Sequence, residues 1–489
     1  MYLGIDAGTS EIKALVLDDD GAIVAVAGAP LTVQRPHPHW SEQQPEEWWK
    51  ALNQALTQLR SKVGKRWSGI RSIGLSGQMH GAVLLGHNGK VLRPCILWND
   101  TRSAEQCETL TRNSPQLHRI AGNLAMPGFT APKLLWVAEH EADLFAQIAY
   151  VLLPKDYLRW RMSGEMVSEM SDAAGTLWLD VARRDWSDQL LAASGLNRTM
   201  MPQLVEGSQI SCLLSADIAG QWGLSDGVVI AGGGGDNAAS AVGIGAVNTG
   251  DAFISLGTSG VLFAVNDRYR PNPQSVVHAF CHALPNRWHQ MSVMLTAASA
   301  LRWLCQLVGS DESSLMAEVE QLSDGQREQS PLFLPYLSGE RTPHNDPWAQ
   351  GAFHGLNHTT TRAHLGYAVI EGVAFGLADG LRVLSESGTE LTECSLVGGG
   401  ARSSCWAQLI ADVLHLPIIT HEGGEAGGAL GAARLAQLAT GADEKTVCVK
   451  PPVHHRYLPD VERWESLQRR LQHWRLLYLQ QVEARRVLS

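Results

Sequence analysis

Several features are absent from this sequence of 489 residues, and each absence argues against a class of protein. It has no excess of positive charge, because 39 basic residues against 49 acidic ones give a net charge of −10. It therefore offers no basic surface for nucleic acid. It also has no uninterrupted apolar run of about 18 residues, as a membrane-spanning helix needs, and its first residues lack the pattern of a signal peptide. We expect a cytoplasmic protein that binds neither nucleic acid nor membranes.

The short motifs of several common site types are also missing. The eight cysteines are scattered without a CxxC spacing and mostly lie in apolar surroundings, which favours buried thiols over disulfides or a zinc site. No GxxxxGK[ST] segment is present, and no GxGxxG follows a strand with an acidic residue at the expected distance. These absences argue against a P-loop or a Rossmann fold as the nucleotide site.

The sequence does contain a repeated hairpin pattern. A single compact core seldom exceeds roughly 250–300 residues, so a chain of 489 residues is expected to form two domains. Residues 2–17 predict a β-hairpin, because two apolar runs flank a GTS turn, and residues 252–265 repeat this plan. The recurrence indicates an internal duplication. Turn residues at 246–251 place the boundary between a first domain at 1–247 and a second at 248–489.

Further short strands and helical patterns follow each hairpin. The segments 70–77 and 394–400 both end a strand in glycine, and this alternation predicts an α/β fold for both domains. Along residues 460–486, apolar side chains recur at steps of three and four, which is typical of an amphipathic helix. We expect this helix to pack on the second domain.

The tips of the two hairpins are candidates for phosphate binding. Their N–H groups and hydroxyls can form a nest for phosphate oxygens, because glycine permits the backbone angles that a nest requires. Asp6 ends an apolar strand before the first tip, where a buried carboxylate is costly without a cation such as magnesium. One such turn is also an ordinary strand connection, but two of them favour a nucleotide clamped between two lobes. The predicted nucleotide contacts are Gly8, Thr9, Ser10, Lys13, Gly257, Thr258 and Ser259.

A third glycine-rich segment lies at residues 396–414, where a strand ends in three glycines and the chain continues as a helix. Such a backbone can approach a base or a ribose closely without side-chain collision. A tight strand-to-helix turn would need the same glycines for packing alone. We assign Gly399, Gly400 and Ser404 to the adenosine side of the site.

The segment AGGGGDNAASAVG at 231–243 supplies a candidate catalytic base. Asp236 follows four glycines and precedes an alanine-rich helix, so it is expected at or near the helix N-terminus. A plain helix cap explains the aspartate but not the glycines, which are costly unless the backbone must approach a ligand. Phosphoryl transfer needs in-line positioning, magnesium and a carboxylate that accepts the hydroxyl proton. Asp236 fits this last role.

Two segments after strand-like runs can contact a polyhydroxylated substrate. They are SGQMHG at 76–81 and LWND at 97–100, in which a methionine and a tryptophan offer apolar faces for a carbon skeleton. A histidine or a tryptophan at such a place is otherwise an ordinary packing residue. The predicted substrate contacts are Gln78, Met79, His80, Trp98, Asn99, Asp236 and Asn237.

With these elements assembled, the sequence resembles the FGGY family of carbohydrate kinases over nearly its whole length. GFTAPKLLWVAEH at 128–140 is similar to the first family signature, and GAFHGLNHTTTRAHLGYAVIEG at 351–372 is similar to the second. Within the family, HPHWSEQQPEEWW (37–49), SDAAGTLWLDV (171–181) and FLPYLSGERTPHND (333–346) resemble the members that phosphorylate D-xylulose.

The resemblance implies two lobes of the actin-like, ribonuclease-H-like ATPase fold, with ATP and Mg²⁺ in the cleft between them. It also implies that Asp6 and Asp236 are catalytic and lie at the metal, that Asp236 accepts the proton, and that D-xylulose 5-phosphate is the product. The expected partners are a ketopentose and ATP, and a homodimer is left open. Another ketose or a polyol stays open as the acceptor. An actin-like nucleotide or sugar sensor is the alternative from another class.

Overall fold

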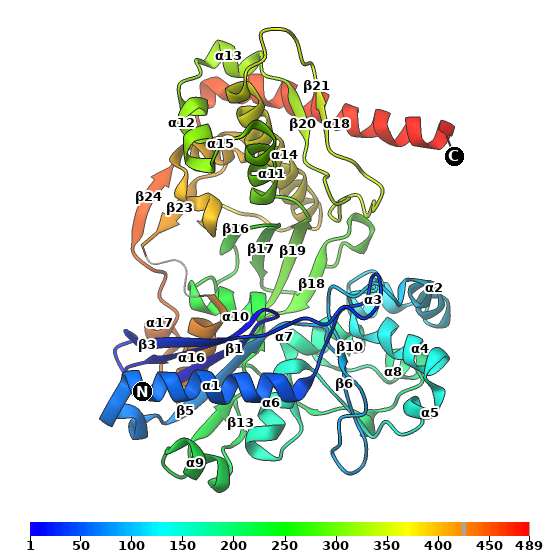
Figure 1. Cartoon of the computed structure of the whole chain (residues 1–489), viewed down its shortest axis with the longest axis vertical. Coiled ribbons are helices and arrows are strands. Elements are labelled where there is room, and N and C mark those ends of the chain that lie inside the picture. Colours follow the sequence, from blue (N-terminus) through cyan, green and yellow to red (C-terminus); the bar gives the residue numbers. More distant parts are fainter. Residues whose placement is uncertain (423–426, 489) are drawn as a thin grey trace.

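The computed structural model describes residues 1–422 and 427–488, and it shows two lobes stacked along the long axis of the molecule (Figure 1). The N-terminal strands lie in the lower lobe of this view, and the C-terminal helix lies near the top of the upper lobe. Each lobe contains a seven-stranded sheet with helices packed against it. The predicted α/β fold with two domains is therefore confirmed.

The sheet of the first lobe has the strand order β3-β2-β1-β5-β14-β13, with the short strand β15 paired to the end of β5. From β3 to β13, neighbouring strands pair antiparallel, antiparallel, parallel, parallel and antiparallel. The strands are β1 (Tyr2–Ala7), β2 (Glu11–Leu17), β3 (Ile23–Pro30), β5 (Ser72–Gly77), β13 (Ile210–Leu213), β14 (Val229–Ala231) and β15 (Gly234–Gly235).

The sheet of the second lobe has the order β18-β19-β17-β16-β22-β23-β24. From β19 to β24 the pairings are again antiparallel, antiparallel, parallel, parallel and antiparallel. Six strands thus repeat the first sheet in order and direction, which confirms the internal duplication. The strands are β16 (Ala252–Leu256), β17 (Gly260–Asn266), β18 (His278–Cys281), β19 (Trp288–Met294), β22 (Cys394–Val397), β23 (Ile418–His421) and β24 (Val453–Tyr457).

The other elements surround these sheets. The helices of the first half are α1 (Pro45–Val63), α2 (Ala104–Asn113), α3 (Leu117–Ala121), α4 (Thr130–His140), α5 (Ala142–Phe145), α6 (Pro154–Ser163), α7 (Met170–Ala173), α8 (Asp188–Ala193), α9 (Ala216–Trp222) and α10 (Asp236–Gly243). Those of the second half are α11 (Ala298–Val308), α12 (Glu312–Glu320), α13 (Asp324–Glu328), α14 (Arg362–Glu386), α15 (Ser404–Leu414), α16 (Gly427–Ala439), α17 (Glu444–Val447) and α18 (Val461–Leu488). Short strands are β4 (Glu42–Gln43), β6 (Val83–Leu85), β7 (Cys95–Ile96), β8 (Tyr150–Leu152), β9 (Val167–Glu169), β10 (Leu179–Asp180), β11 (Asp185–Trp186), β12 (Gln203–Val205), β20 (Leu332–Leu334) and β21 (Ala352–His354).

Both predicted hairpins are present. Strands β1 and β2 pair around the turn at residues 8–10, and β16 and β17 pair around the turn at residues 257–259. The predicted C-terminal helix is α18, and it packs on the second lobe through buried Leu467, Leu471 and Trp474. The indole N–H of Trp474 donates a hydrogen bond to the carbonyl of Phe333 at 2.7 Å. These expectations are therefore confirmed.

Helix α16 comes from the second half of the chain but packs on the sheet of the first lobe, where Figure 1 shows it beside β1. Two glycines make this close approach possible. A Cβ atom at Gly74 would lie 1.8 Å from the carbonyl oxygen of Ala432, and one at Gly4 would lie 2.0 Å from that of Ala429. The helix therefore connects the second half of the chain to the sheet of the first lobe.

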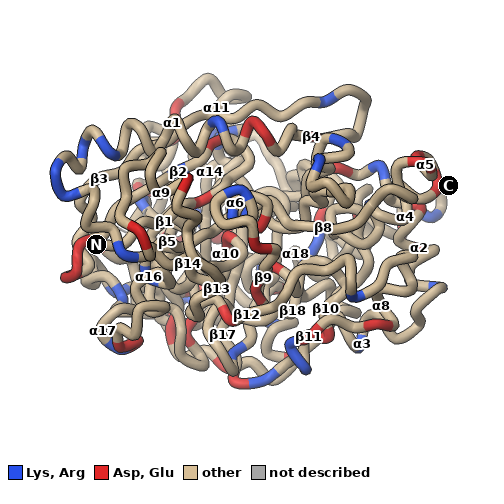
Figure 2. The backbone as a smooth tube through the Cα atoms, turned by 90° about the horizontal axis from the view of Figure 1, so that it is seen from below, with Lys and Arg blue, Asp and Glu red and all other residues tan. Residues whose placement is uncertain are grey.

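The structure also shows where the cysteines and the charged residues lie. All eight cysteines are free thiols and six of them are buried, which confirms the prediction of buried thiols. Figure 2 shows acidic and basic residues interspersed along the backbone. Within the ranges 1–422 and 427–488, no helix combines the length and the apolar character that a membrane span requires.

Candidate active site

Two pockets lie next to each other around the second hairpin tip. The interlobe pocket has a volume of about 330 Å³, and side chains of both lobes form its wall. The glycine-rich pocket has a volume of about 570 Å³ and belongs to the second lobe. The interlobe pocket is lined by Met79, His80, Trp98, Met126, Gly128, Phe129, Asp236, Asn237, Ser255, Ser259, Val261, His278, Phe280, Met291, Val293 and Arg341. The glycine-rich pocket is lined by Leu256, Gly257, Thr258, Ala298, Leu301, Arg302, Glu312, Ser313, Met316, Ala317, Glu320, Gly399, Gly400, Arg402, Ser403, Ser404 and Trp406.

Asp236 is the first residue of α10 and lines the interlobe pocket. The N-cap position belongs to Gly235, so Asp236 does not cap the helix. Its Oδ1 accepts hydrogen bonds from the backbone N–H and the Nδ2 of Asn237, at 2.7 and 2.9 Å. Burial and the negative charge of Asp6 raise the pKa of Asp236 to about 6. A carboxylate with such a pKa is a suitable proton acceptor near neutral pH.

Asp6 lies near the end of β1, next to Ser76 of the parallel strand β5. The hydroxyl of Ser76 donates to its Oδ1 at 2.9 Å. Burial raises the pKa of Asp6, while the hydrogen bond from Ser76 and the charge of Lys13, opposite Asp6 in the hairpin, lower it. Lys13 itself is 41% exposed and lies 3.8 Å from Glu11.

The glycines before Asp236 are required mainly by the protein itself. A Cβ atom at Gly232 would lie 2.2 Å from the carbonyl oxygen of Glu206, and one at Gly233 would lie 2.2 Å from that of Leu75. Gly233 also has a φ of +83°, which favours glycine. The approach of a ligand, which the sequence suggested as the reason for this run, is thus unnecessary to explain these two glycines.

Buried polar groups hold both ends of the loop that presents Asp236. The guanidinium of Arg159 donates to the carbonyls of residues 231 and 232, at 2.6 and 2.5 Å. At the other end, the N–H of Gly235 donates to the hydroxyl of Ser171 at 3.0 Å. The hydroxyl of Ser171 donates in turn to Glu169 at 2.8 Å. These bonds fix the start of α10 and with it the position of the carboxylate.

Met79 and His80 line the interlobe pocket, as the sequence predicts for substrate contacts. His80 has a φ of +69°, and its carbonyl accepts a hydrogen bond at 2.8 Å from the buried ammonium of Lys133. Its Nδ1 lies 2.7 Å from the carbonyl of Gly175, which can only accept, so Nδ1 carries the proton. Burial lowers the pKa of His80 to about 3. The ring is therefore neutral, and its Nε2 is an acceptor.

Trp98 connects the interlobe pocket to the first hairpin tip. Its side chain is 44% exposed, and its indole N–H donates to the hydroxyl of Thr9 at 3.0 Å. The hydroxyl of Thr9 donates to Oε1 of Gln78 at 2.9 Å. Gln78 therefore contacts the first tip and lies outside the wall of the pocket, as does the half-buried Asn99.

The second hairpin tip joins the two pockets. Ser259 lines the interlobe pocket, whereas Gly257 and Thr258 line the glycine-rich pocket. The latter also contains the predicted adenosine contacts Gly399, Gly400 and Ser404. The first tip, Gly8, Thr9 and Ser10, lines neither pocket, and neither does Lys13.

Several wall residues have no counterpart in the sequence analysis. Phe129, His278 and Arg341 line the interlobe pocket, and Arg302 and Glu320 line the glycine-rich pocket. Phe129 and Arg341 belong to segments that carry the family resemblance, which is the one signal that could have marked them. His278 lies in a buried strand and looks like a packing residue in the sequence.

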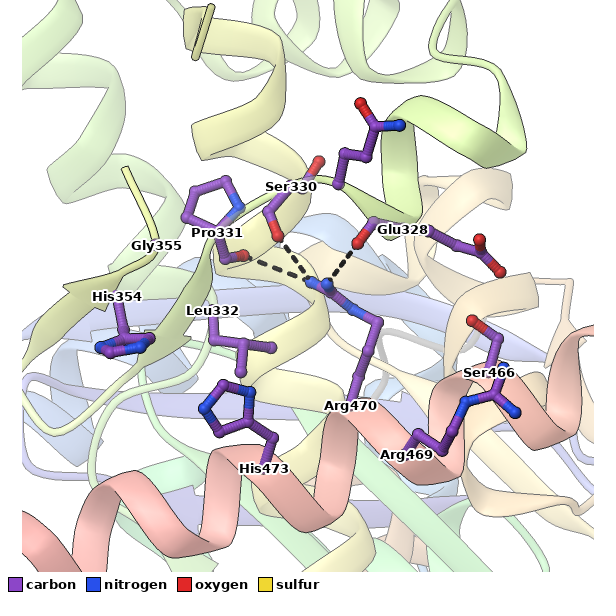
Figure 3. Close-up of a pocket in the computed structure, with 11 residues that line it drawn as sticks. Glu328, Ser330, Pro331, Leu332, His354, Gly355, Ser466, Arg469, Arg470 and His473 are labelled. Atoms are coloured by element: carbon purple, nitrogen blue, oxygen red, sulfur yellow. Dashed lines mark hydrogen bonds between the residues drawn. The ribbon is translucent and has the colours of Figure 1, made fainter. Parts of the chain in front are cut away.

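A further pocket of about 490 Å³ lies in the second lobe between β21, α18 and the loop after α13 (Figure 3). Arg470 lies in its wall, but its guanidinium already has protein partners. It pairs with Glu371 at 2.6 Å and donates to three backbone carbonyls. His354 and His473 face each other with ring centroids 5.4 Å apart. Neither hairpin tip nor Asp236 lines this pocket, so it is separate from the predicted site.

The carboxylates of the site suit a magnesium ion that also binds phosphate. In the part of the chain that the structure describes, no group of three or more His, Cys, Asp or Glu side chains forms a metal site. Mg²⁺ commonly uses one or two carboxylates and completes its shell with water and phosphate oxygens. Asp6 and Asp236 supply two carboxylates whose pKa values are raised by burial, and a cation would stabilise their charged forms.

The duplicated sheets and the two pockets match one protein family. Residues 1–243 match the N-terminal domain of the FGGY family of carbohydrate kinases, and residues 252–440 match its C-terminal domain. The chain belongs to the FGGY family of carbohydrate kinases, whose phosphoryl donor is ATP. The resemblance seen in the sequence motifs is therefore confirmed.

Individual relatives cover nearly the whole chain. The xylulose kinase of Escherichia coli (strain K12) is 50% identical over 483 residues, which span 98% of this chain and 99% of that protein. The crystal structure of a "xyloylose kinase" from Brucella ovis has a TM-score of 0.95 at 51% identity and covers 100% of both chains. The xylulose kinase from Rhodospirillum rubrum has a TM-score of 0.92 at 28% identity, with 98% of both chains covered.

Proposed function

We propose that the protein transfers the γ-phosphoryl group of ATP to the 5-hydroxyl of D-xylulose, giving D-xylulose 5-phosphate and ADP. The observation that carries this proposal is the second hairpin tip, which borders both the pocket of Asp236 and the glycine-rich pocket. A nucleotide in one pocket and a sugar in the other would place the transferred group at this tip. The relative from Escherichia coli, a xylulose kinase at 50% identity, supports this choice of acceptor.

In this proposal Asp236 accepts the proton of the 5-hydroxyl. Its pKa of about 6 keeps it mostly deprotonated at neutral pH and still basic enough to take up a proton. Nε2 of His80 accepts a hydrogen bond from a sugar hydroxyl, and Asn237 offers its amide oxygen. Met79 and Trp98 pack against the carbon skeleton. Gln78 and Asn99, which lie outside the wall of the pocket, support these contacts from behind.

The nucleotide lies in the glycine-rich pocket in this proposal. Gly399, Gly400 and Ser404 contact the adenosine, and Gly257, Thr258 and Ser259 contact the phosphates. Gly8, Thr9, Ser10 and Lys13 approach the phosphates from the first lobe when both ligands are bound. Neutralising the phosphate charges by cations and fixed dipoles is the main demand of phosphoryl transfer.

Asp6 and Asp236 are the proposed magnesium ligands. The ion, when bound with ATP, neutralises charge on the phosphate oxygens. Asp6 holds its place through Ser76 and acts on the phosphate side, whereas Asp236 faces the acceptor hydroxyl.

The chain divides in this proposal into a first domain at 1–247, which binds the sugar and carries the base, and a second at 248–489, which binds adenosine. Helix α16 belongs to the second segment but packs on the sheet of the first lobe, so it connects the two proposed domains. The requirement for ATP favours a cytoplasmic place of action.

A coupled assay of ADP release over pentuloses, hexuloses, polyols and aldoses tests the acceptor. We expect D-xylulose to give the highest kcat/KM. A higher kcat/KM for another ketose or for a polyol would show that D-xylulose is not the preferred acceptor, while the kinase activity itself would still hold. Complete absence of sugar-dependent ADP release would instead favour a nucleotide or sugar sensor.

A further inference from the structure

The acceptor must be bound as an open chain, a requirement that rests on the proposed function. A 2-ketopentose closes to a furanose ring through O5, which then no longer carries a hydroxyl. Transfer to O5 therefore requires the acyclic form, and this form has a free carbonyl at C2. With O5 at Asp236, the C1–C2 end is the part of the extended chain farthest from this carboxylate. A carbonyl oxygen can only accept hydrogen bonds, so its partner in the pocket must be a donor.

The two histidines of the pocket cannot serve as that donor. Nδ1 of His80 donates to the carbonyl of Gly175 at 2.7 Å, and Nδ1 of His278 lies 3.0 Å from Oδ1 of Asn123. Both amide hydrogens of Asn123 point to carbonyls, so its Oδ1 is the acceptor and Nδ1 of His278 carries the proton. Burial holds the pKa of both rings far below neutral. Each ring therefore presents Nε2 as an acceptor, which suits a sugar hydroxyl and not a carbonyl.

The other donors of the wall are engaged or lie at the nucleotide end. The amide of Asn237 donates one hydrogen to the proposed base at 2.9 Å, which keeps this side chain beside Asp236, and the indole of Trp98 donates to the first hairpin tip at 3.0 Å. Ser255 and Ser259 lie on β16 and its turn, beside the glycine-rich pocket. That leaves Arg341, whose guanidinium makes no hydrogen bond or ion pair with any residue that the structure describes.

Arg341 is held in place by its neighbours on the loop between β20 and β21. Glu340 Oε1 accepts from the backbone N–H groups of Leu295 and Arg341, at 2.9 and 2.7 Å. Thr342 exchanges two hydrogen bonds with the backbone of Val293, each 3.0 Å long. The carboxylate of Glu340 is thus used by backbone donors, and the guanidinium is left for the pocket. Arg341 is half-buried in the wall of the pocket, and a partly desolvated guanidinium without a protein partner is available to an acceptor group of a ligand.

The guanidinium and Asp236 come from opposite lobes, because hydrogen bonds of Glu340 and Thr342 hold the Arg341 loop beside β19, whereas Asp236 starts α10 of the first lobe. The positive charge of Arg341 lowers the pKa of His80 and of His278, whereas the charge that acts on Asp236 is that of Asp6. The wall therefore offers the carboxylate of Asp236 from the first lobe and a cationic donor from the second. An acyclic ketose has the matching order, with the reacting hydroxyl at one end and the carbonyl near the other.

We propose that Arg341 donates hydrogen bonds to the C2 carbonyl oxygen of the open-chain ketose and so sets the preference for a ketose over a polyol. A guanidinium matches an oxygen that only accepts, and its charge strengthens the bond. In a polyol, C2 is tetrahedral and carries a hydroxyl group. This hydroxyl is a weaker acceptor than a carbonyl oxygen, and its own proton needs an acceptor in the pocket. The second lobe thus supplies the residue that distinguishes the oxidation state of C2.

The test compares D-xylulose with xylitol and D-arabinitol, its two reduction products at C2, which keep the rest of the chain unchanged. In Arg341→Met, kcat/KM for D-xylulose should fall roughly 10- to 100-fold, the effect of losing a charge-assisted hydrogen bond, mostly through KM. For the two polyols the loss should stay below about threefold, because a neutral hydroxyl gains less from the charge. The ketose-to-polyol ratio therefore collapses. Arg341→Lys, which keeps the charge but loses the fork, should give an intermediate ratio.

Arg268→Met is the matched control, because Arg268 is 69% exposed and pairs with neighbouring Asp267. It should leave all three substrates unchanged. The ADP affinity and the melting temperature of each variant check its fold, and Arg341→Lys carries the test if Arg341→Met does not fold. Equal losses for ketose and polyols would overturn the role of Arg341, since they would place it on the phosphoryl group. Wild-type protein that prefers another ketose refutes the proposed acceptor alone, and the ratio is then measured with that ketose and its own reduction products.

Discussion

At the scale of single residues, the role of Asp236 in the interlobe pocket can be tested by substitution. Asp236→Ala removes the proposed proton acceptor but leaves the wall of the glycine-rich pocket intact. Turnover should therefore fall by roughly 10²–10⁴-fold while ADP binding is retained. Coupled ADP release and calorimetric titration with ADP measure the two quantities. Turnover that equals that of the wild type would show that Asp236 is not the base.

The pKa of Asp236 also predicts a pH dependence. Only the deprotonated carboxylate accepts a proton, so kcat/KM should fall about tenfold per pH unit on the acid side. The fall should begin near pH 6, because burial and the charge of Asp6 raise this pKa to about 6. Asp6→Asn removes the charge that raises the pKa, so it should lower the pKa of Asp236 in metal-free protein, as measured by carbon-13 NMR of labelled aspartate. A titration that Asp6→Asn leaves unmoved would contradict this coupling.

Some residues of the candidate site belong to local sequence motifs and could be predicted, whereas others belong to no such motif and could not. Asp236 follows a glycine run, and the tip at 257–259 repeats the tip at 8–10, so local order marks them. His278 and Arg341 reach the pocket from a buried strand and a distant loop, and no fixed spacing connects them to Asp236. The glycine run drew attention to Asp236, which lines the interlobe pocket, but the reason was incomplete, because contacts with the protein's own backbone require two of the glycines.

At the scale of elements, the contact between β5 and α16 should be sensitive to a single methyl group. Gly74→Ala would place a Cβ atom 1.8 Å from a carbonyl oxygen of α16. Neither backbone can move without disturbing a sheet or a helix, so the substitution should cost at least roughly 1–3 kcal/mol. Thermal unfolding should show a clearly lower midpoint.

Gly325→Ala is the matched control for this prediction, because no atom lies within 4 Å of its added methyl group and it lies within helix α13. It should leave the midpoint unchanged or raise it slightly, since alanine favours a helix. Equal midpoints for the wild type and Gly74→Ala would show that α16 can shift without cost.

Elements formed by neighbouring segments could be predicted, and those formed by distant segments could not. The two hairpins and α18 follow from alternation or helical periodicity within single stretches. The placement of α16 on the first sheet depends on glycines at 4 and 74, more than 300 residues earlier in the chain. A small residue in a strand does not reveal which helix will cover it.

At the scale of the whole molecule, a pocket with walls from both lobes should couple the two ligands. Asp236 comes from the first lobe and Ser259 from the second, so a bound sugar contacts both and favours the arrangement that also holds the nucleotide. The affinity for a non-hydrolysable ATP analogue should rise roughly 5- to 150-fold with saturating sugar, the usual range of coupling between sites.

Titration calorimetry in both orders measures this coupling, which must be equal in the two directions. A sugar that the protein does not phosphorylate serves as the control and should leave the nucleotide affinity unchanged. Identical nucleotide affinities with and without the accepted sugar would mean that the lobes respond independently.

The position of α16 also bears on how the protein is made. The sheet of the first lobe is complete in sequence once residue 235 has been synthesised, but the helix that covers β1 and β5 ends at Ala439. At about 5–20 residues per second, the ribosome needs roughly 10–40 s to supply that helix. During this interval the surface of the sheet around Gly4 and Gly74 has no helix packed on it. The first lobe therefore completes its fold late in translation.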